Sequence, residues 1–367
     1  MSVTLRFMLY TVITAMMAGC GQESLPPPPE GPAVGMQRFA WTDSERTAWD
    51  GAGPRPVAAT VWYPAEDAEQ AAVLIPPKRP VFFMGHAARN APLVRGDTRH
   101  PVVLLSHGTG GAALQMMWLG SALAAHGYVV VAVDHHGNTA AESAYDARGF
   151  RLVWERIPDL GVALDRLAAD PTFGPRIDTG NVSAVGFSLG GYTVLGLAGA
   201  RTDLDRLQAF CAGANADGTC EPQGEYPDAA QDFADMLEDD PALAAAFERA
   251  GDDYGDPRID RIVTIAPAIG QAFSSEALSV INLPVLIIVG SEDDVAPATT
   301  NAAHIGAHLS SGRLEILEGA GHYVFLAQCT ARGRRHVPAC VDPDGVDRGD
   351  VHQRVISAVI DFLDAAE

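Results

Sequence analysis

Short, unbroken apolar runs recur along the chain and alternate with segments that carry a helical pattern of apolar residues. The runs lie at 101–106, 128–133, 182–187, 261–266, 284–290 and 313–317. The helical segments between and after them lie at 112–126, 151–169, 192–200 and 351–363. Strands that are apolar along their whole length are buried on both faces, and their alternation with helices is typical of a parallel sheet. The pattern therefore predicts an α/β fold built on a mainly parallel, doubly wound sheet.

Two stretches interrupt this rhythm. Residues 65–99 have no clear period, and we expect a long loop there, after a strand at 57–64 whose final proline suits a sheet edge. Residues 201–257 are rich in Ala, Asp and Glu and contain helical patterns at 229–238 and 241–249. We interpret 201–257 as an insertion, or cap, over the carboxyl edge of the sheet. Open α/β sheets bind ligands at that edge, so the insertion is placed to shape a substrate pocket, with a solvated decoration as the alternative.

Residues 1–20 have the features of an export signal. One early cation, Arg6, precedes an apolar run at 7–18 that is too short to span a bilayer permanently. Small residues directly before Cys20 resemble a bacterial lipobox, although Met17 replaces the usual leucine. We therefore expect Cys20 to carry a lipid that anchors the protein in a membrane, facing the periplasm or cell surface; a soluble secreted form is the alternative. Residues 21–40, with four successive prolines, predict an extended tether, and 41–367 the folded domain.

The remaining cysteines support an oxidising compartment. Apart from Cys20 there are four, spaced as two local pairs. Three connectivities are possible, but the short loops favour Cys211–Cys220 and Cys329–Cys340. A zinc site is the other interpretation of four cysteines, and the absence of any Cys-X-X-Cys spacing disfavours it.

Composition excludes one class of partner. The 367-residue chain is 47% hydrophobic and has a formal net charge of −21 at pH 7. It holds ample material for a large core, either as one α/β domain with an insertion or as two domains. A surface this acidic, without a basic stripe, repels nucleic acid. We therefore expect no nucleic-acid binding.

The chemistry centres on the run Asn181-Val-Ser-Ala-Val-Gly-Phe-Ser-Leu-Gly-Gly191. An apolar strand leads directly into Ser188, and a helical run follows, so Gly-X-Ser-X-Gly stands at a sharp strand-to-helix turn. Glycine on both sides of the serine lets strand and helix approach closely, since glycine has no Cβ. Such a turn presents a serine hydroxyl as a nucleophile. The alternative is a merely tight turn.

A serine nucleophile needs a base and an acid that orients the base, in the chain order Ser, Asp or Glu, His. The run at 284–290 is followed by Ser291-Glu292-Asp293-Asp294, and the run at 313–317 by a glycine-lined loop that contains His322. Both follow strands whose carboxyl ends share an edge with Ser188. We predict His322 as the base and Asp293 as the acid, with Asp294 as the alternative acid. The non-functional interpretation of this acidic cluster is a solvated turn.

Two backbone N–H groups are candidates for an oxyanion hole. Leu189 begins the helix after the serine, and Thr109 lies in the loop His107-Gly-Thr-Gly-Gly111 after the strand at 101–106. That loop lacks the Lys-Ser/Thr pair of a phosphate loop. The polar run Asp134-His135-His136 also follows a strand, but such loops are common, and we expect no metal there.

Together these motifs resemble the α/β-hydrolase superfamily. Gly186-Phe-Ser-Leu-Gly190, Ser106-His-Gly-Thr-Gly110, Gly290-Ser-Glu-Asp293 with Pro297, and Gly321-His322 match its elbow, oxyanion, acid and histidine motifs. Trp62-Tyr-Pro64 and Asp134-His-His-Gly-Asn-Thr139 resemble bacterial predicted dienelactone hydrolases related to platelet-activating-factor acetylhydrolase. The resemblance runs from about Val57 to the C-terminus and implies an eight-strand sheet and a serine esterase without a cofactor. True dienelactone hydrolases use cysteine where this chain has Ser188, which favours ordinary carboxylic esters.

The sequence therefore predicts an exported serine hydrolase that cleaves carboxylic esters through an acyl-enzyme. A lipase, a phospholipid acetylhydrolase or a polyester hydrolase are alternatives within the enzyme class. A catalytically silent binding lipoprotein on the same fold is the alternative outside it. The sequence indicates no oligomeric state.

Overall fold

The six apolar runs form adjacent parallel strands. The computed structural model describes residues 25–365, and in it the strands follow the order β10-β9-β8-β7-β5-β6, every neighbouring pair being parallel. Their bounds are β5 (His100–Ser106), β6 (Val129–His135), β7 (Ile177–Phe187), β8 (Ile259–Ile265), β9 (Val285–Gly290) and β10 (Gly312–Leu317). The predicted α/β fold with a mainly parallel sheet is confirmed.

A mostly antiparallel portion, in which only β1 and β4 pair in parallel, extends the sheet beyond β6. β2 (Pro54–Ala65) pairs with β6, and β1 (Ala33–Thr47) pairs with β2 over most of its length. β4 (Phe82–Arg89) lies beside β1, and β3 (Ala71–Ile75) and β11 (Gln328–Cys329) both pair with β4. The described sheet therefore has eleven strands, whereas the family resemblance implied eight.

Three expectations for the N-terminal part are wrong. Residues 33–40 belong to β1, so the tether predicted at 21–40 stops, and the folded domain starts, before residue 41. The loop predicted at 65–99 contains β3 and β4. β2 is an interior strand, because it pairs with β1 on one side and with β6 on the other, whereas its proline predicted a place near the sheet edge. β1 pairs with the next strand, β2, and β3 with the next strand, β4, whereas β2 also pairs with β6 further along the chain. Local periodicity does not reveal which strands pair. Cys20 and the predicted signal at 1–20 lie outside the described residues.

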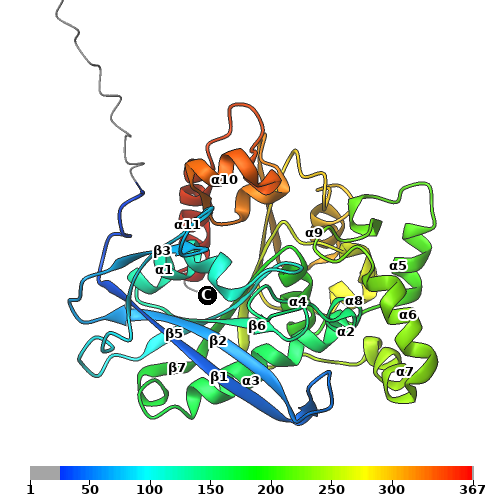
Figure 1. Cartoon of the computed structure of the whole chain (residues 1–367), viewed down its shortest axis with the longest axis horizontal. Coiled ribbons are helices and arrows are strands. Elements are labelled where there is room, and N and C mark those ends of the chain that lie inside the picture. The colour runs from blue at the N-terminus through cyan, green and yellow to red at the C-terminus, as the bar shows by residue number, and fades with distance from the viewer. Residues whose placement is uncertain (1–24, 366–367) are drawn as a thin grey trace, which may run out of the picture.

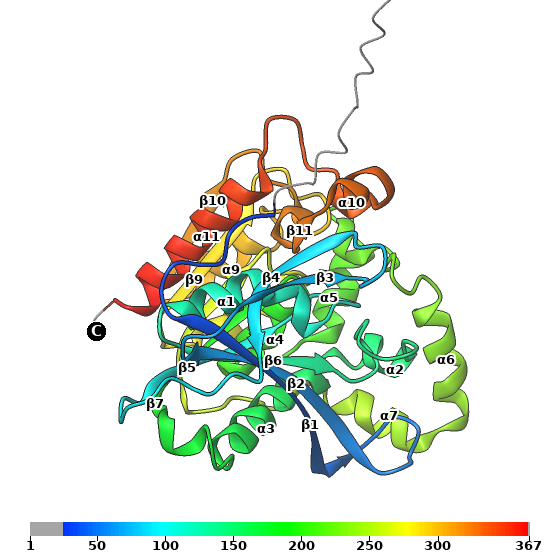
Figure 2. The same ribbon diagram turned by 60° about the vertical axis from the view of Figure 1, so that its left-hand side comes forward.

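The two faces of the sheet bury separate layers of helices (Figures 1 and 2). Side chains alternate across each strand, so Val102 and Leu104 of β5 join one apolar cluster and Val103 and Leu105 the other. α3 (Ile157–Ala168) and α4 (Leu189–Leu197) pack in the first cluster, and α1 (Met117–Ala125) and α11 (Arg348–Leu363) in the second. The helices hold the carboxyl ends of the parallel strands, and the loops after them, in fixed positions.

The predicted insertion is largely helical. α5 (Leu204–Cys211), α6 (Ala229–Asp239) and α7 (Pro241–Glu248) lie at the right-hand edge of Figure 1. Phe247 packs edge-on against Trp154, with 5.7 Å between ring centroids, which fixes α7 to the body of the domain. Both predicted disulfides, Cys211–Cys220 and Cys329–Cys340, are formed.

Short helices complete the chain. The remaining α-helices are α2 (Ala147–Arg151), α8 (Ser275–Ser279), α9 (Ala302–His308) and α10 (Ala331–His336). The 3-10 helices are η1 (Ala113–Met116), η2 (Val153–Arg156), η3 (Gly174–Arg176), η4 (Gly218–Cys220), η5 (Arg249–Gly251), η6 (Gly270–Ala272), η7 (His322–Phe325) and η8 (Pro338–Cys340). Within residues 25–365, no helix has the length and apolar character needed to cross a membrane.

Candidate active site

Ser188 stands at the turn between β7 and α4, in a backbone conformation of φ 54° and ψ −119°. A positive φ is rare for a residue with a side chain and marks local strain. The flanking glycines make the turn possible. A Cβ on Gly186 would lie 2.0 Å from the Gly190 carbonyl oxygen, and one on Gly190 would lie 2.0 Å from the Ser106 carbonyl oxygen. The elbow therefore requires glycine at both positions.

The structure brings the predicted serine, histidine and acid into one chain of hydrogen bonds. Ser188 Oγ lies 2.9 Å from His322 Nε2, and His322 Nδ1 lies 2.7 Å from Asp293 Oδ2. Ser188 follows β7, Asp293 follows β9, and His322 begins η7 after β10, so all three lie at the carboxyl edge of the sheet. All three residues are at least 94% buried, which shields their hydrogen bonds from water.

The two neighbouring acids occupy different environments. Asp293 is 5% exposed and uses its second oxygen, Oδ1, to accept the backbone N–H groups of Val295 (3.1 Å) and Ala296 (2.7 Å). The carboxylate is thereby held rigidly against His322. Asp294 is exposed and lines the adjacent pocket. The geometry therefore assigns the histidine contact to Asp293.

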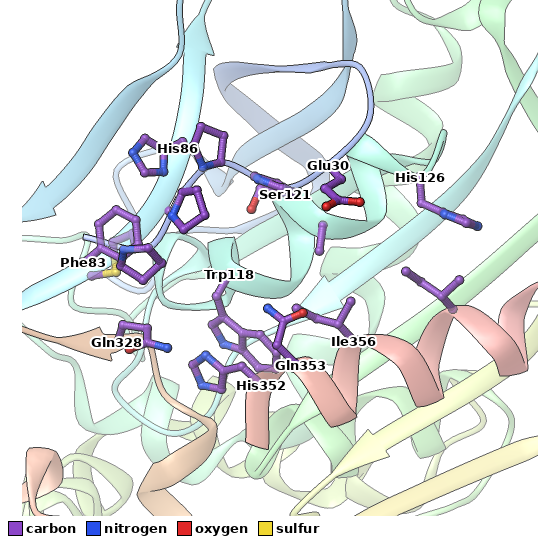
Figure 3. A pocket seen from close by; sticks show the side chains of 18 residues that line it. Glu30, Phe83, His86, Trp118, Ser121, His126, Gln328, His352, Gln353 and Ile356 are labelled. Carbon is purple, nitrogen blue, oxygen red and sulfur yellow. The ribbon is translucent and has the colours of Figure 1, made fainter. Parts of the chain in front are cut away.

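Side chains of α1 and α11 donate hydrogen bonds to η7, the segment that begins with His322. Trp118 of α1 donates its indole N–H to the Phe325 carbonyl (3.1 Å), and His352 of α11 donates Nε2–H to the Val324 carbonyl (2.9 Å). Burial lowers the pKa of His352 to about 3, so the ring is neutral at neutral pH. The two rings stack at 3.9 Å (Figure 3). Sequence analysis missed both residues, because on helices they carry no local motif.

A cavity of about 440 Å³ lies beside these rings; Figure 3 shows the side chains that line it. It is bounded by the proline segment 26–29 and by residues of β4, α1 and α11. Neither Ser188 nor His322 lines it. It is separate from the pocket above the serine.

The pocket above Ser188 has a volume of about 380 Å³ and is lined by Thr109, His322 and residues 221–225 of the predicted insertion. The insertion thus shapes this pocket, as its position in the sequence suggested. Its loop is fixed at the base by Asp217, which accepts hydrogen bonds from Thr300 Oγ1 and, at 3.2 Å, from Asn301 Nδ2. The disulfide Cys211–Cys220 closes the same loop.

The two expected oxyanion donors flank the serine. Leu189 is the first residue of α4, and the 107–110 loop packs against the elbow, since a Cβ on Gly108 would lie 3.1 Å from Ser188 Cβ. Among residues 25–365, the backbone N–H groups of Thr109 and Leu189 donate to no other group. Both therefore remain available to a ligand.

Behind this loop lies a buried polar network that the sequence did not reveal. His135 Nε2 lies 2.9 Å from Ser106 Oγ, and its Nδ1 lies 3.1 Å from Asp159 Oδ2. Asp134 instead accepts the Ala113 N–H, and His136 pairs with Glu142. The run 134–136 thus sends its side chains to three different places. In the described residues, no group of three or more metal-ligating side chains is gathered.

Comparison with known proteins agrees with this architecture. A stretch of 112 residues is 32% identical to cutinase est1 of Thermobifida alba and to cutinase 2 of Thermobifida cellulosilytica. It covers 30% of this chain and 34% and 38% of those enzymes, so the match spans about a third of their length. The solved structure of a ferulic acid esterase from Streptomyces cinnamoneus superposes with a TM-score of 0.61 at 21% identity. That superposition covers 92% of this chain and 91% of the esterase, and it shows a shared fold.

A family model covers the part of the chain that contains the elbow, the acid and the histidine. It is described as the alpha/beta hydrolase family, and it matches residues 102–332. Those residues are more than half of the 367 in the chain. On this match, and with a sheet and elbow of the required form, the chain belongs to the alpha/beta hydrolase family.

Proposed function

We propose that the protein is a serine esterase that hydrolyses carboxylic esters through an acyl-enzyme. One observation carries the proposal: the unbroken hydrogen-bond chain from Ser188 through His322 to Asp293, at the floor of an open pocket. A serine hydroxyl is a weak nucleophile by itself, and a base at 2.9 Å that is held by a carboxylate activates it.

The proposed reaction has two halves. Ser188 Oγ attacks the ester carbonyl carbon while its proton passes to His322 Nε2, and the imidazolium is stabilised by Asp293. The N–H groups of Thr109 and Leu189 donate to the oxyanion, each such donor lowering the barrier by about 3 kcal/mol. His322 then protonates the departing alcohol. In the second half, His322 activates a water molecule that attacks the acyl-enzyme and releases the acid.

Cutinase-like polyester hydrolysis is the second candidate for the substrate class. The observation that favours it is the 32% identity to Thermobifida cutinases over 112 residues. The pocket volume of about 380 Å³ lies at the lower end of the range for small-ligand sites, which suits a short acyl group or one repeat of a polyester chain. Lipase and phospholipid acetylhydrolase activities have no comparable observation in their favour. The completely assembled hydrogen-bond chain also favours an enzyme over a silent binding lipoprotein.

We also propose that the protein is exported and anchored by a lipid on Cys20. Support comes from the apolar segment and small residues before Cys20 and from two formed disulfides, which need an oxidising compartment. We assign the chain to the dienelactone hydrolase and platelet-activating-factor acetylhydrolase branch on the runs 62–64 and 134–139.

Labelling with a fluorophosphonate tests the enzymatic proposal. We expect one covalent adduct per molecule, on Ser188, together with hydrolysis of nitrophenyl acetate. Ser188→Ala should abolish both while leaving the melting temperature within a few degrees of wild type. Hydrolysis of a longer nitrophenyl ester and of a soluble polyester then separates the two substrate classes. A folded protein that takes up no label and hydrolyses none of these esters would contradict the proposal.

A further inference from the structure

A fully buried arginine lies directly behind the loop that carries Thr109. Arg156, the last residue of η2, is 1% exposed. Its Nη2 donates to the His107 carbonyl oxygen and, at 3.4 Å, to Ser106 Oγ, and its Nη1 lies 3.5 Å from Asn138 Oδ1. The guanidinium therefore contacts the strand end and the start of the loop at once.

Asn138 links Arg156 to Gly110, at the other end of the loop. Its Oδ1 accepts the Gly110 N–H at 2.6 Å, and its Nδ2 donates to the Gly149 carbonyl at 3.1 Å. Arg156 thus holds the loop on both sides of Thr109, directly at His107 and through Asn138 at Gly110.

The orientation of one peptide unit depends on this support. The Gly108 carbonyl accepts two hydrogen bonds from within the loop, from the Gly111 N–H at 3.1 Å and from His107 Nδ1–H at 2.7 Å. In a planar trans peptide the C=O and the following N–H point in opposite directions. The Thr109 N–H therefore points to the other side of the peptide plane, away from this network. Tilting the His107 carbonyl would rotate that N–H.

The charge of Arg156 has no carboxylate partner. Within the described chain its hydrogen bonds go only to neutral oxygens. The charge of Asp159 acts on Arg156, but Asp159 forms its hydrogen-bonded ion pairs with Arg55 at 2.8 Å and with Arg46 at 2.5 Å.

The charges around Asp159 balance without Arg156. Three carboxylates form ion pairs with three other arginines, and none of these ion pairs includes Arg156. The balanced set comprises Asp43, Glu155, Asp159, Arg46, Arg55 and Arg249. Burial lowers the pKa of Arg156 to about 9, which still leaves the group charged at neutral pH.

A buried cation without a counterion is expensive to maintain, so a loop that needed only hydrogen-bond donors would be served better by a neutral side chain. An anion that forms transiently on the other side of the loop gives the positive charge a function. In a site from which water is excluded, such a charge acts at short range with little screening.

We propose that Arg156 is a positioning residue of the oxyanion hole: it fixes the 107–110 loop so that the Thr109 N–H faces the substrate, and its unpaired charge favours the negative oxygen of the tetrahedral intermediate. This inference rests on the proposed esterase function, because it assumes that an oxyanion forms above Ser188.

Substitution of Arg156 in the full-length protein tests the inference. We expect Arg156→Gln to lower kcat for nitrophenyl acetate about tenfold, with KM changing less than about twofold. Arg156→Lys keeps the charge but not the forked contact and should lower kcat by about threefold. Active sites are counted by fluorophosphonate titration, so that kcat refers to folded enzyme only.

A transition-state analogue separates this role from a merely structural one. An alkyl trifluoromethyl ketone forms a tetrahedral adduct with an oxyanion, so its Ki should rise in each variant by the factor by which kcat falls. Arg249→Gln is the matched control, because Arg249 belongs to the same cluster but is half exposed and contacts Glu155 instead of the loop. Its kcat and Ki should equal those of wild type.

Unchanged kcat and Ki in a folded Arg156→Gln would overturn the inference, as would a kcat loss without a rise in Ki. If the Gln variant does not fold, the Lys variant decides by the same two readouts. Wild-type protein that takes up no fluorophosphonate and hydrolyses no ester contradicts the proposed function instead. An active wild type with an unaffected Arg156 variant contradicts only this inference.

Discussion

Asp293 and Asp294 are adjacent in sequence and chemically identical, yet the fold gives them different partners. Asp293 is buried and joined to His322 and to two backbone N–H groups, while Asp294 is exposed at the pocket wall. An elbow, a histidine and an acidic cluster were recognisable from residue types. The choice between the two acids depended on a turn whose shape only the packed loop defines.

This difference gives a prediction at the scale of one residue. In Asp293→Asn the side-chain oxygen can still accept the Val295 and Ala296 N–H groups, so the turn is retained. The new amide then donates to His322 Nδ1, which leaves the ring proton on Nε2 and prevents that nitrogen from accepting the serine proton. We expect kcat to fall about 10,000-fold.

Asp294→Asn is the matched control and should keep kcat within about twofold of wild type, since screened charges at an exposed site contribute little. Initial rates with nitrophenyl acetate measure both variants. Equal losses in the two would contradict the assignment of Asp293.

At the scale of elements, long-range pairing defined what local pattern did not. β1 pairs with β2, β4 lies beside β1, and β3 pairs with β4, so each of these strands is defined by its place beside another strand. The insertion behaves differently. Its helices were readable from their period, but its place over the serine follows from Asp217 binding the loop after β9 through Thr300 and Asn301.

The disulfide Cys211–Cys220 is expected to control that placement. Its loop is short, with a sequence separation of 9, and a bond of this size stabilises a fold by roughly 3 kcal/mol. Two contacts hold residues 221–225 in place: the disulfide and the hydrogen bonds of Asp217. The double variant Cys211→Ser with Cys220→Ser removes the disulfide and leaves the Asp217 hydrogen bonds. We expect KM for a long-chain nitrophenyl ester to change severalfold while kcat for nitrophenyl acetate stays within about twofold.

Removing the other bond, with Cys329→Ser and Cys340→Ser, provides the comparison. Neither cysteine lines the pocket, so the melting temperature should fall without a change in the ratio of KM for long and short esters. If both double variants alter that ratio equally, the insertion does not set acyl-chain preference through its disulfide.

At the scale of the whole molecule, two opposing effects of pH are built in. The formal net charge of −21 makes repulsion fall as acid is added, which favours folding. Buried histidines act in the other direction. Burial, with nearby Arg156, holds the pKa of His107 well below 6.5 and lowers that of His135 to about 3, and burial with Arg348 lowers that of His352 to about 3.

Between about pH 6.5 and pH 4, we expect the buried histidines to affect the free energy of unfolding more than the loss of surface repulsion does. Their folded pKa values lie below the unfolded value, so the stability they contribute is complete above about pH 6.5 and is lost as pH falls toward 3. Three such groups give a slope of up to about 4 kcal/mol per pH unit. Urea unfolding across this range measures it, and the slope should persist in about 0.5 M salt, which screens surface repulsion. Stability that rises on acidification would contradict this expectation.

His352→Asn isolates one of the three groups. The variant removes one proton taken up on unfolding, so the slope should decrease by about one third even though the starting stability is lower. An unchanged slope would mean that His352 is not a neutral, buried group in the folded protein.

The sequence alone determined the parallel core, the elbow at Ser188, the histidine beside it, the pairing of the four cysteines and the family. These features are local: an apolar run, a glycine on each side of a serine, or a short spacing is complete within a few residues. Only the tertiary structure decided which of Asp293 and Asp294 contacts His322, the strands at 33–47, 71–75 and 82–89, and the buried cation behind the 107–110 loop. Each of these depends on how separate segments pack against one another, and the free energy of such contacts comes from burial that no single segment encodes.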